Sequence, residues 1–205
     1  MKSAIKIFKH SSVRINKVYV DPYKIDEFYN DAEYIFITHS HYDHYSKDDI
    51  DKIVNDNTKF IVPLSMKDDF DYDNEVLYVE PNKKYTIDNI EFETIPMYNI
   101  NKKFHKKEYN WCGYNICINN IYYYFVGDSD DIPEIHSVKC DYIFIPIGGI
   151  YTMDINEAIE CLKTVDYKYV IPYHYGTIVG SVELGIYFKD KMGERCILKI
   201  WERNQ

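Results

Sequence analysis

The chain has 205 residues and a mass of 24.5 kDa, long enough to bury a substantial hydrophobic core. Its 46% hydrophobic and 17% aromatic content is typical of a globular protein and excludes disorder over most of the length. A formal net charge of -9 makes nucleic acid, a polyanion, an unexpected partner. Five cysteines without a Cys-x-x-Cys pair are typical of reduced thiols, and no apolar run approaches the roughly 18 residues of a membrane span. We therefore expect a cytoplasmic protein without a membrane partner.

Short runs of β-branched and aromatic residues, bounded by Pro, Gly, Asn and Asp, predict a strand-rich chain. The first three runs follow one another closely, which favours an antiparallel start. The expected strands are residues 4–8, 12–15, 17–20, 34–38, 59–62, 76–79, 84–87, 90–95, 111–118, 121–126, 142–147, 168–172 and 196–200.

Helical periodicity is confined to a few segments. Ser46 is the expected N-cap of the first helix, with Asp49 imitating a capping box, and Asp154 with Glu157 can cap the second. No linker, repeat or low-complexity tract divides the chain, so we expect one domain over residues 1–205, strand-rich first and α/β-like later. The expected helices are residues 47–55, 154–165 and 182–190.

The stretch THSHYDHYS, residues 38–46, places three histidines and an aspartate directly after an apolar run. Alternate side chains of an extended backbone point the same way, so His39 and His41 form one group, while Asp43 and His44 can be aimed elsewhere. Neutral imidazole and carboxylate suit zinc, iron or manganese, and the absence of nearby cysteine argues against a structural zinc knuckle. A solvated polar turn is the alternative, which so many histidines at fixed spacings disfavour. The stretch therefore predicts two adjacent metal sites.

His-x-His-x-Asp-His after an apolar strand resembles the signature of the metallo-β-lactamase superfamily. The resemblance continues in order along the chain through Asp21 in VYVDPY, His105 in KKFHKK, Asp128 in FVGDSD and His174 in VIPYHYG. KHSSVRI and PIGGIYTMD are most similar to the small, stand-alone, ascorbate-phosphate-lactonase-like hydrolases of that superfamily. The resemblance implies an α/β (α+β) fold, the four-layered αβ/βα sandwich with its metals at one edge.

The resemblance also implies two divalent metal ions. Zinc is the favoured metal, and manganese and iron are the alternatives. The third ligand of the first metal stays open, because His105 lies in an irregular loop and Asn99 is closer to where related proteins place that ligand. An ordinary Gly-Asp turn and a buried structural histidine are the alternatives for the aspartate and the late histidine. The implied ligands are His39, His41 and His105 for the first metal, Asp43, His44 and His174 for the second, and Asp128 as the bridge.

Residues near the proposed ligands are expected to support them. By resemblance, Asp21 orients a cluster histidine through a hydrogen bond, although a turn-forming Asp-Pro is the alternative. His10 either lines the site or packs beneath it, and His136 is expected on the surface. Residues 99–110 are polar and basic and are expected to form a surface loop. Phenols beside the site could donate hydrogen bonds to developing oxyanion charge, and the candidates are Tyr42, Tyr98 and Tyr173.

The implied chemistry is hydrolysis. Two metals lower the pKa of a shared water towards about 7, which makes it a hydroxide nucleophile, and Asp43 could orient it beside the bridging Asp128. We expect a metal-dependent hydrolase of a small ester, lactone or phosphodiester that acts on a small-molecule substrate. The alternative is a metal-stabilised binding or regulatory protein that has lost turnover.

The sequence gives little evidence for RNA, for a second copy of the chain or for an anionic substrate as a partner. An RNA-processing nuclease of the same superfamily usually carries an added RNA-gripping domain, for which this acidic chain has no room. The sequence does not indicate an oligomeric state. A basic loop is the one hint of an anionic substrate, with solvated surface lysines as the alternative, and its lysines are Lys102, Lys103, Lys106 and Lys107.

Overall fold

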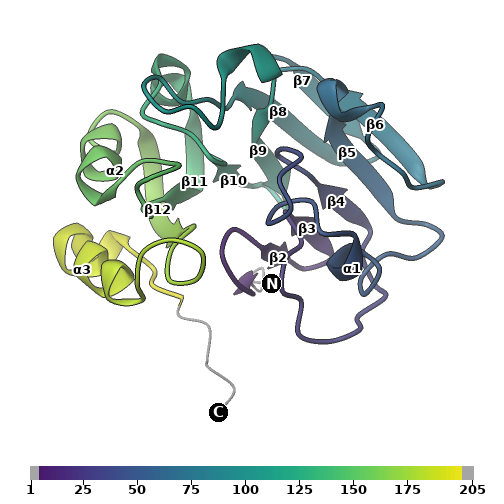
Figure 1. Ribbon diagram of the computed structural model, residues 1–205, viewed down its shortest axis with the longest axis horizontal. Helices are drawn as coiled ribbons and strands as arrows, with labels where there is room; N and C mark the ends of the chain where they lie inside the picture. The colour runs from purple at the N-terminus through teal and green to yellow at the C-terminus, as the bar shows by residue number, and fades with distance from the viewer. Residues whose placement is uncertain (1–4, 200–205) are drawn as a thin grey trace. The chain divides into compact units, whose positions relative to one another are not determined.

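A computed structural model describes residues 5–199 of the chain, which form two compact units, residues 5–80 and 81–199. Each unit holds one six-stranded sheet (Figure 1). The mixed α/β content agrees with the fold class predicted from the sequence. The expectation of one domain over residues 1–205 stays a prediction.

The sheet of the first unit has its strands in sequence order. β1, β2 and β3 pair antiparallel, as the sequence predicts for the start of the chain, whereas β3 to β6 pair parallel. Val20 of β3 lies opposite Phe36 of β4, so the carboxyl ends of these two strands lie side by side at one edge of the sheet. The strands are β1 (Ile5–Ile7), β2 (Val13–Ile15), β3 (Val18–Val20), β4 (Tyr34–Phe36), β5 (Lys59–Pro63) and β6 (Glu75–Val79).

The first helix is shorter than predicted. α1 (Lys47–Ile50) has one turn, since the Asn-Asp-Asn segment 55–57 favours a turn over further helix, although Ile53 is still buried in the core. Ser46 is the N-cap, but its hydroxyl donates to the Asp49 carboxylate at 2.7 Å instead of capping a backbone N–H.

The Asp49 carboxylate holds a neighbouring loop. It accepts hydrogen bonds from the backbone N–H groups of Lys24, at 2.8 Å, and Ile25, at 3.0 Å. Burial opposes ionisation, but the hydrogen bonds from Lys52, Ser46 and the Lys24 backbone outweigh it and lower the pKa of Asp49. This carboxylate therefore ties the loop after β3 to α1.

The sheet of the second unit has the order β12-β11-β10-β9-β8-β7. β9 and β10 form a hairpin whose two loop residues, Asn119 and Asn120, both have positive φ, as a tight hairpin turn requires. β10, β11 and β12 pair parallel, so their carboxyl ends share one edge. The strands are β7 (Lys84–Ile87), β8 (Ile90–Pro96), β9 (Cys112–Ile118), β10 (Ile121–Phe125), β11 (Lys139–Pro146) and β12 (Asp166–Tyr173).

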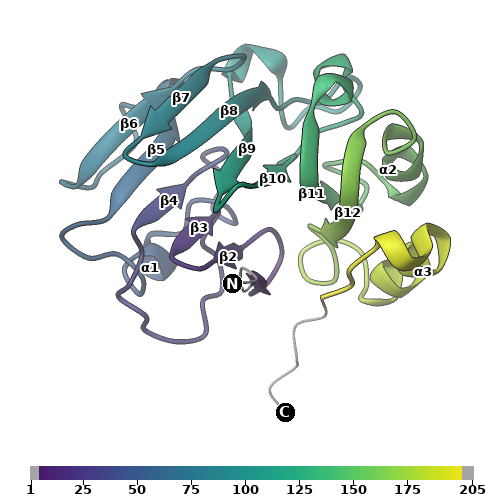
Figure 2. The same cartoon turned by 180° about the vertical axis from the view of Figure 1, so that it is seen from behind.

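Two helices lie beside β12 in both views, α2 (Ile155–Cys161) and α3 (Glu183–Met192) (Figures 1 and 2). The predicted capping box of α2 is present, with Asp154 and Glu157 bonding each other's backbone N–H groups. No helix within residues 5–199 is long and apolar enough to cross a lipid bilayer. Short 3-10 helices complete the described chain at η1 (Leu64–Met66), η2 (Lys107–Tyr109), η3 (Pro133–Ser137) and η4 (Gly193–Arg195).

The ends of the described chain differ from the prediction. The prediction of a closing strand over residues 196–200 is wrong for residues 196–199. Cys196 forms an isolated bridge with Val170, and the Ile197 N–H donates to the Val170 carbonyl, but no strand follows within the described residues. Residue 200 lies outside the described residues, as does residue 4 of the first predicted strand.

Candidate metal centre

The predicted histidine cluster follows β4 and lies in the first unit. His39 and His44 are fully buried, with ring centroids 4.0 Å apart, and Asp43 is also buried. His39 Nε2 and His41 Nδ1 are 3.1 Å apart, while His44 Nε2 lies 3.9 Å from Asp43 Oδ2. The sequence predicts that His39 and His41 point the same way and that Asp43 and His44 can be aimed elsewhere. The His39 ring lies near both His41, at 4.7 Å between centroids, and His44, at 4.0 Å, so the division into two groups stays a prediction.

Asp21 and Thr38 fix the orientation of two histidine rings. Thr38 donates to Asp21 from its backbone N–H at 2.8 Å and from its hydroxyl at 2.7 Å, and His44 Nδ1 lies 2.8 Å from Asp21 Oδ2. The hydrogen bond from a cluster histidine to Asp21 that the resemblance implied is therefore present. Because the Thr38 hydroxyl donates its proton to Asp21, it accepts from His39 Nδ1 at 2.9 Å. Both rings then carry the proton on Nδ1 and present the Nε2 lone pair.

Burial raises the pKa of the Asp21 carboxyl, and the neighbouring His44 and Thr38 oppose this rise. Asp21 itself has a left-handed backbone, with φ 47°. Thr38 was not singled out in the sequence, although a hydroxyl directly before the cluster was a usable signal.

His10 supports Asp43. It occupies the tight turn between β1 and β2 with φ 59°, and its imidazole is fully buried. His10 Nε2 lies 3.0 Å from Asp43 Oδ2, and the ring packs edge-on against His44 at 5.7 Å. Of the two roles that the sequence left open for His10, the structure shows direct contact with a proposed ligand.

The second unit brings together the other three predicted ligands. Asp128 follows β10 and Gly127, and His174 follows β12, so the parallel pairing of β10 to β12 carries both to one edge of the sheet. Asp128 Oδ2 lies 2.9 Å from His174 Nε2 and 3.4 Å from His105 Nε2. All three side chains are buried, and His174 has φ 56°. The Gly127 N–H donates to the Tyr173 hydroxyl at 2.6 Å, which fixes the turn before Asp128.

His105 lies next to Asp128, and Asn99 supports it. His105 Nδ1 donates to Asn99 Oδ1 at 3.0 Å, and the Asn99 amide donates to Asp130 and to the Tyr151 carbonyl. His105 is only 1% exposed, so the expectation of a surface loop over residues 99–110 is wrong at this point. Asn99 fixes the ring so that Nε2 faces Asp128.

Gly148 permits the close approach of β11 and the segment around His174. A Cβ at this position would lie 2.3 Å from the His174 carbonyl oxygen and 2.5 Å from Val179 Cγ2. Only glycine fits here without displacing the backbone of a proposed ligand.

The basic loop is largely neutralised by nearby carboxylates. Lys102 pairs with Asp130, Lys106 with Glu108, and Lys107 with Glu134. These pairs favour the alternative of surface lysines over an anion-binding loop.

The tyrosines proposed as donors have different surroundings. Tyr98 donates to Glu134 at 3.0 Å, and the Tyr173 hydroxyl accepts from Gly127. Tyr42, next to Asp43, is 65% exposed and packs edge-on against Tyr23. It therefore remains the one candidate whose ring is open to solvent.

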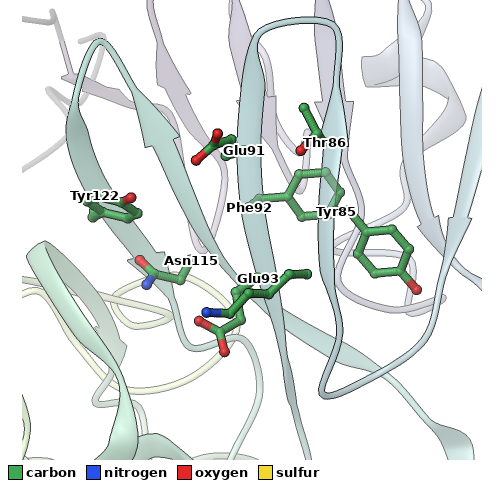
Figure 3. Close-up of a pocket in the computed structure, with 8 residues that line it drawn as sticks. Tyr85, Thr86, Glu91, Phe92, Glu93, Asn115 and Tyr122 are labelled. Atoms are coloured by element: carbon green, nitrogen blue, oxygen red, sulfur yellow. The ribbon is translucent and has the colours of Figure 1, made fainter.

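A hollow lies in each of the described units. One of about 330 Å³ lies over β7 to β10, and Figure 3 shows Tyr85, Phe92 and Tyr122 around it. None of the predicted ligands lines it. A second, of about 500 Å³, is lined by Tyr23, Tyr42 and neighbouring residues up to Lys52. The second hollow adjoins a predicted ligand in sequence, because its lining residue Tyr42 directly precedes Asp43.

Comparison with known proteins decides the family. A family model described as "Beta-lactamase superfamily domain" matches residues 4–174. The chain belongs to the β-lactamase superfamily. This membership confirms the family resemblance and the predicted metallo-β-lactamase fold, whereas the closer likeness to ascorbate-phosphate lactonases stays a prediction.

Members of this superfamily resemble the chain over most of its length. A metal-dependent hydrolase from Nanoarchaeum equitans is 28% identical over 185 residues, 84% of each chain. One from Sulfolobus acidocaldarius is 32% identical over 177 residues, 77% of this chain and 72% of the relative. The solved structure of a metallo hydrolase from Ignicoccus hospitalis shares the fold, with a TM-score of 0.78 at 19% identity, and covers 97% of this chain and 94% of its own.

Proposed function

We propose that the chain is a metal-dependent hydrolase that binds two divalent ions and cleaves a small ester, lactone or phosphodiester. Zinc is the preferred metal in this proposal, with manganese and iron as alternatives. The curated relatives from Nanoarchaeum and Sulfolobus are named metal-dependent hydrolases, which supports the reaction class. The assignment of ligands from both units to a shared pair of metals rests on the family resemblance. The proposed ligands are His39, His41, His105, Asp43, His44, His174 and Asp128.

One observation carries the proposal: three of the proposed histidine ligands have Nδ1 fixed by an acceptor built into the fold. Asp21 holds His44, the Thr38 hydroxyl holds His39, and Asn99 holds His105. Metal-binding histidines almost always donate their second ring N–H in this way, because the bond sets the tautomer and aims the lone pair. Neutral imidazoles and carboxylates also match the donors that zinc, manganese and iron accept. The residues therefore fit a divalent cation.

The residues of the chain have separable roles in this chemistry. Bound divalent ions supply an acidified water and polarise the electrophilic oxygen of the substrate. Asp43, whose Oδ2 lies 3.0 Å from His10 Nε2, would accept a hydrogen bond from the attacking water and orient it. Asp128, whose Oδ2 lies 3.4 Å from His105 Nε2 and 2.9 Å from His174 Nε2, would supply a carboxylate that offsets cationic charge at the site.

The hollow lined by Tyr23 and Tyr42 supports a small-molecule substrate. Tyr23 and Tyr42 present their rings with centroids 6.1 Å apart, and Lys24 lies 5.3 Å from the Tyr23 ring centroid. Aromatic rings with a few polar groups are typical of small-ligand sites. We assign the non-reacting part of the substrate to this hollow.

The test begins with metal content by elemental analysis, on protein purified without chelator. His41→Ala and Asp128→Asn should each bind at least one ion fewer than wild type. Asp166→Asn is the matched control, because Asp166 is an exposed partner of Lys139 and should leave the metal content unchanged.

Activity on a panel of esters, lactones and phosphodiesters then follows on the metal-loaded protein. Turnover that is lost in both ligand variants supports the hydrolase. A wild type that binds no metal after zinc or manganese is added contradicts the proposal. A metal-loaded protein that is inert on the whole panel would favour the alternative, a binding or regulatory protein.

A further inference from the structure

A second group of metal-binding side chains lies in the second unit and shares no residue with the proposed ligands. Asp131 lies in the loop after β10, His136 on η3, and Cys161 is the last residue of α2. One ligand atom from each residue lies within 4.8 Å of the other two. Three segments distant in sequence therefore bring oxygen, nitrogen and sulfur donors to one place.

The imidazole of His136 and the carboxylate of Asp131 lie close together. His136 Nε2 lies 2.9 Å from Asp131 Oδ1, and the Asp131 carboxylate also accepts a hydrogen bond from the Cys161 thiol. Two ligands of one cation also lie about 3 Å or slightly more apart, so Asp131 stands between the two other donors as a shared ligand set requires. Ligands of a tetrahedral zinc, at about 2.0–2.3 Å from the metal, are roughly 3.3–3.7 Å apart, so the separations of these donor atoms, all within 4.8 Å, would change by about 1.5 Å at most.

Thr164 fixes the tautomer of His136. The Thr164 hydroxyl donates to the Cys161 carbonyl at 3.1 Å, so it must accept from His136 Nδ1 at 2.5 Å. With Nδ1 as the donor, a neutral His136 presents the Nε2 lone pair to the group. This is the same support that the histidines of the candidate metal centre receive.

We propose that Asp131, His136 and Cys161 bind one thiophilic divalent cation, zinc above all. Carboxylate, thiolate and neutral imidazole together carry two negative charges, which balance one divalent ion. Thiolate prefers zinc, cobalt and cadmium to magnesium or calcium. The side chains of His136 and Asp131 are 34% and 33% exposed, so solvent can supply the fourth ligand, whereas Cys161 is fully buried.

Binding at this site releases a proton. Burial and the nearby Asp131 carboxylate raise the pKa of the Cys161 thiol, so the thiol keeps its proton until a cation displaces it. The bound ion would join the loop that follows Asp128 to the end of α2. In this proposal His136, which the sequence predicts to be a surface residue, is a ligand.

Cobalt(II) is the probe, because thiolate-bound cobalt gives a near-ultraviolet charge-transfer band that histidine and carboxylate ligands do not give. Metal-free wild type should show this band at saturating cobalt, and added zinc should abolish it. Cys161→Ser should lose the band. His136→Gln, a change at a partly exposed side chain that leaves folding intact, should weaken cobalt binding at least tenfold. Cys140→Ser, at another buried cysteine of the same unit, is the matched control and should keep the band.

The cobalt experiment tests this second metal site independently of the proposed hydrolase activity. His41→Ala should keep the band while it binds fewer cobalt ions in total, because His41 belongs to the other group of ligands. Absence of the band in wild type at saturating cobalt would overturn the inference. Survival of the band in Cys161→Ser, or unchanged affinity in His136→Gln, would overturn it as well.

Discussion

Replacing Asp21 with Asn tests whether the hydrogen bonds behind the histidine cluster set its metal affinity. The Asp21 carboxylate accepts three hydrogen bonds, two from Thr38 and one from His44, at 2.7–2.8 Å. Asparagine keeps one acceptor oxygen for the Thr38 N–H and places an NH2 group against the other two donors. His44 can bond this amide only by accepting at Nδ1, which moves the ring proton to Nε2 and removes the lone pair that would bind metal.

The magnitude follows from the bonds that are lost. A hydrogen bond to a charged group contributes about 1.5–3 kcal/mol, and Asp21→Asn removes two of them. The lower desolvation penalty of a neutral amide offsets part of this loss, so we expect a net decrease of roughly 2 kcal/mol in the free energy of unfolding. Loss of the acceptor behind a metal-binding histidine typically costs about 10–100-fold in metal affinity.

The assay pairs urea unfolding of the metal-free protein with zinc titration against a competing chelator. Asp31→Asn serves as the control, since Asp31 also accepts two side-chain hydrogen bonds in the first unit but contacts no histidine. It should lower stability without changing zinc affinity. Wild-type zinc affinity in Asp21→Asn would refute the reasoning about the tautomer, even if the stability fell as expected.

Three further changes test the framework of the proposed site. Asp49→Asn should lower the unfolding free energy by about 1–3 kcal/mol at pH 7. Because the folded pKa of Asp49 is lowered, this difference should persist above the unfolded pKa of about 3.9 and shrink as the pH falls below it, in urea titrations from pH 7 to pH 3. Gly148→Ala should destabilise by about 1–3 kcal/mol and reduce metal content by elemental analysis, since the new methyl group displaces the His174 carbonyl. Tyr173→Phe should cost about 1–3 kcal/mol in thermal unfolding, because it leaves the buried Gly127 N–H without its acceptor, and an unchanged melting temperature would contradict this role.

The sequence was most informative where the signal is local. Nearly every predicted strand is present within a few residues, because alternating apolar residues and turn-forming Asn, Asp and Pro act over short distances. The closely spaced histidines of residues 39–44 identified the cluster for the same reason. The helix over residues 47–55 was predicted too long, since its apolar spacing also fits a turn whose Ile53 packs into the core.

Hydrogen-bond partners were harder to predict because they depend on which strands are neighbours. Thr38 and Asp21 meet only because β3 and β4 pair parallel in register. Asn99 and His105 meet through the folding back of an irregular loop that has no periodicity to read. Sequence spacing does not encode these contacts, so Thr38 and the support of His105 by Asn99 were missed, and Asp21 was predicted to orient a cluster histidine only through the family resemblance.

Three residues at or next to the proposed ligands have a left-handed backbone that lowers the stability of the folded protein. His10, Asp21 and His174 adopt φ values of 59°, 47° and 56°, a region that disfavours side chains with a Cβ by about 1–2 kcal/mol per residue. Glycine or asparagine would relax this strain. A library of variants selected only for melting temperature, in the presence of chelator, should therefore accumulate Gly and Asn at positions 10 and 174, whereas the three hydrogen bonds that Asp21 accepts should retain Asp21. Such a selection would raise the stability of the fold and remove side chains on which the proposed metal binding depends.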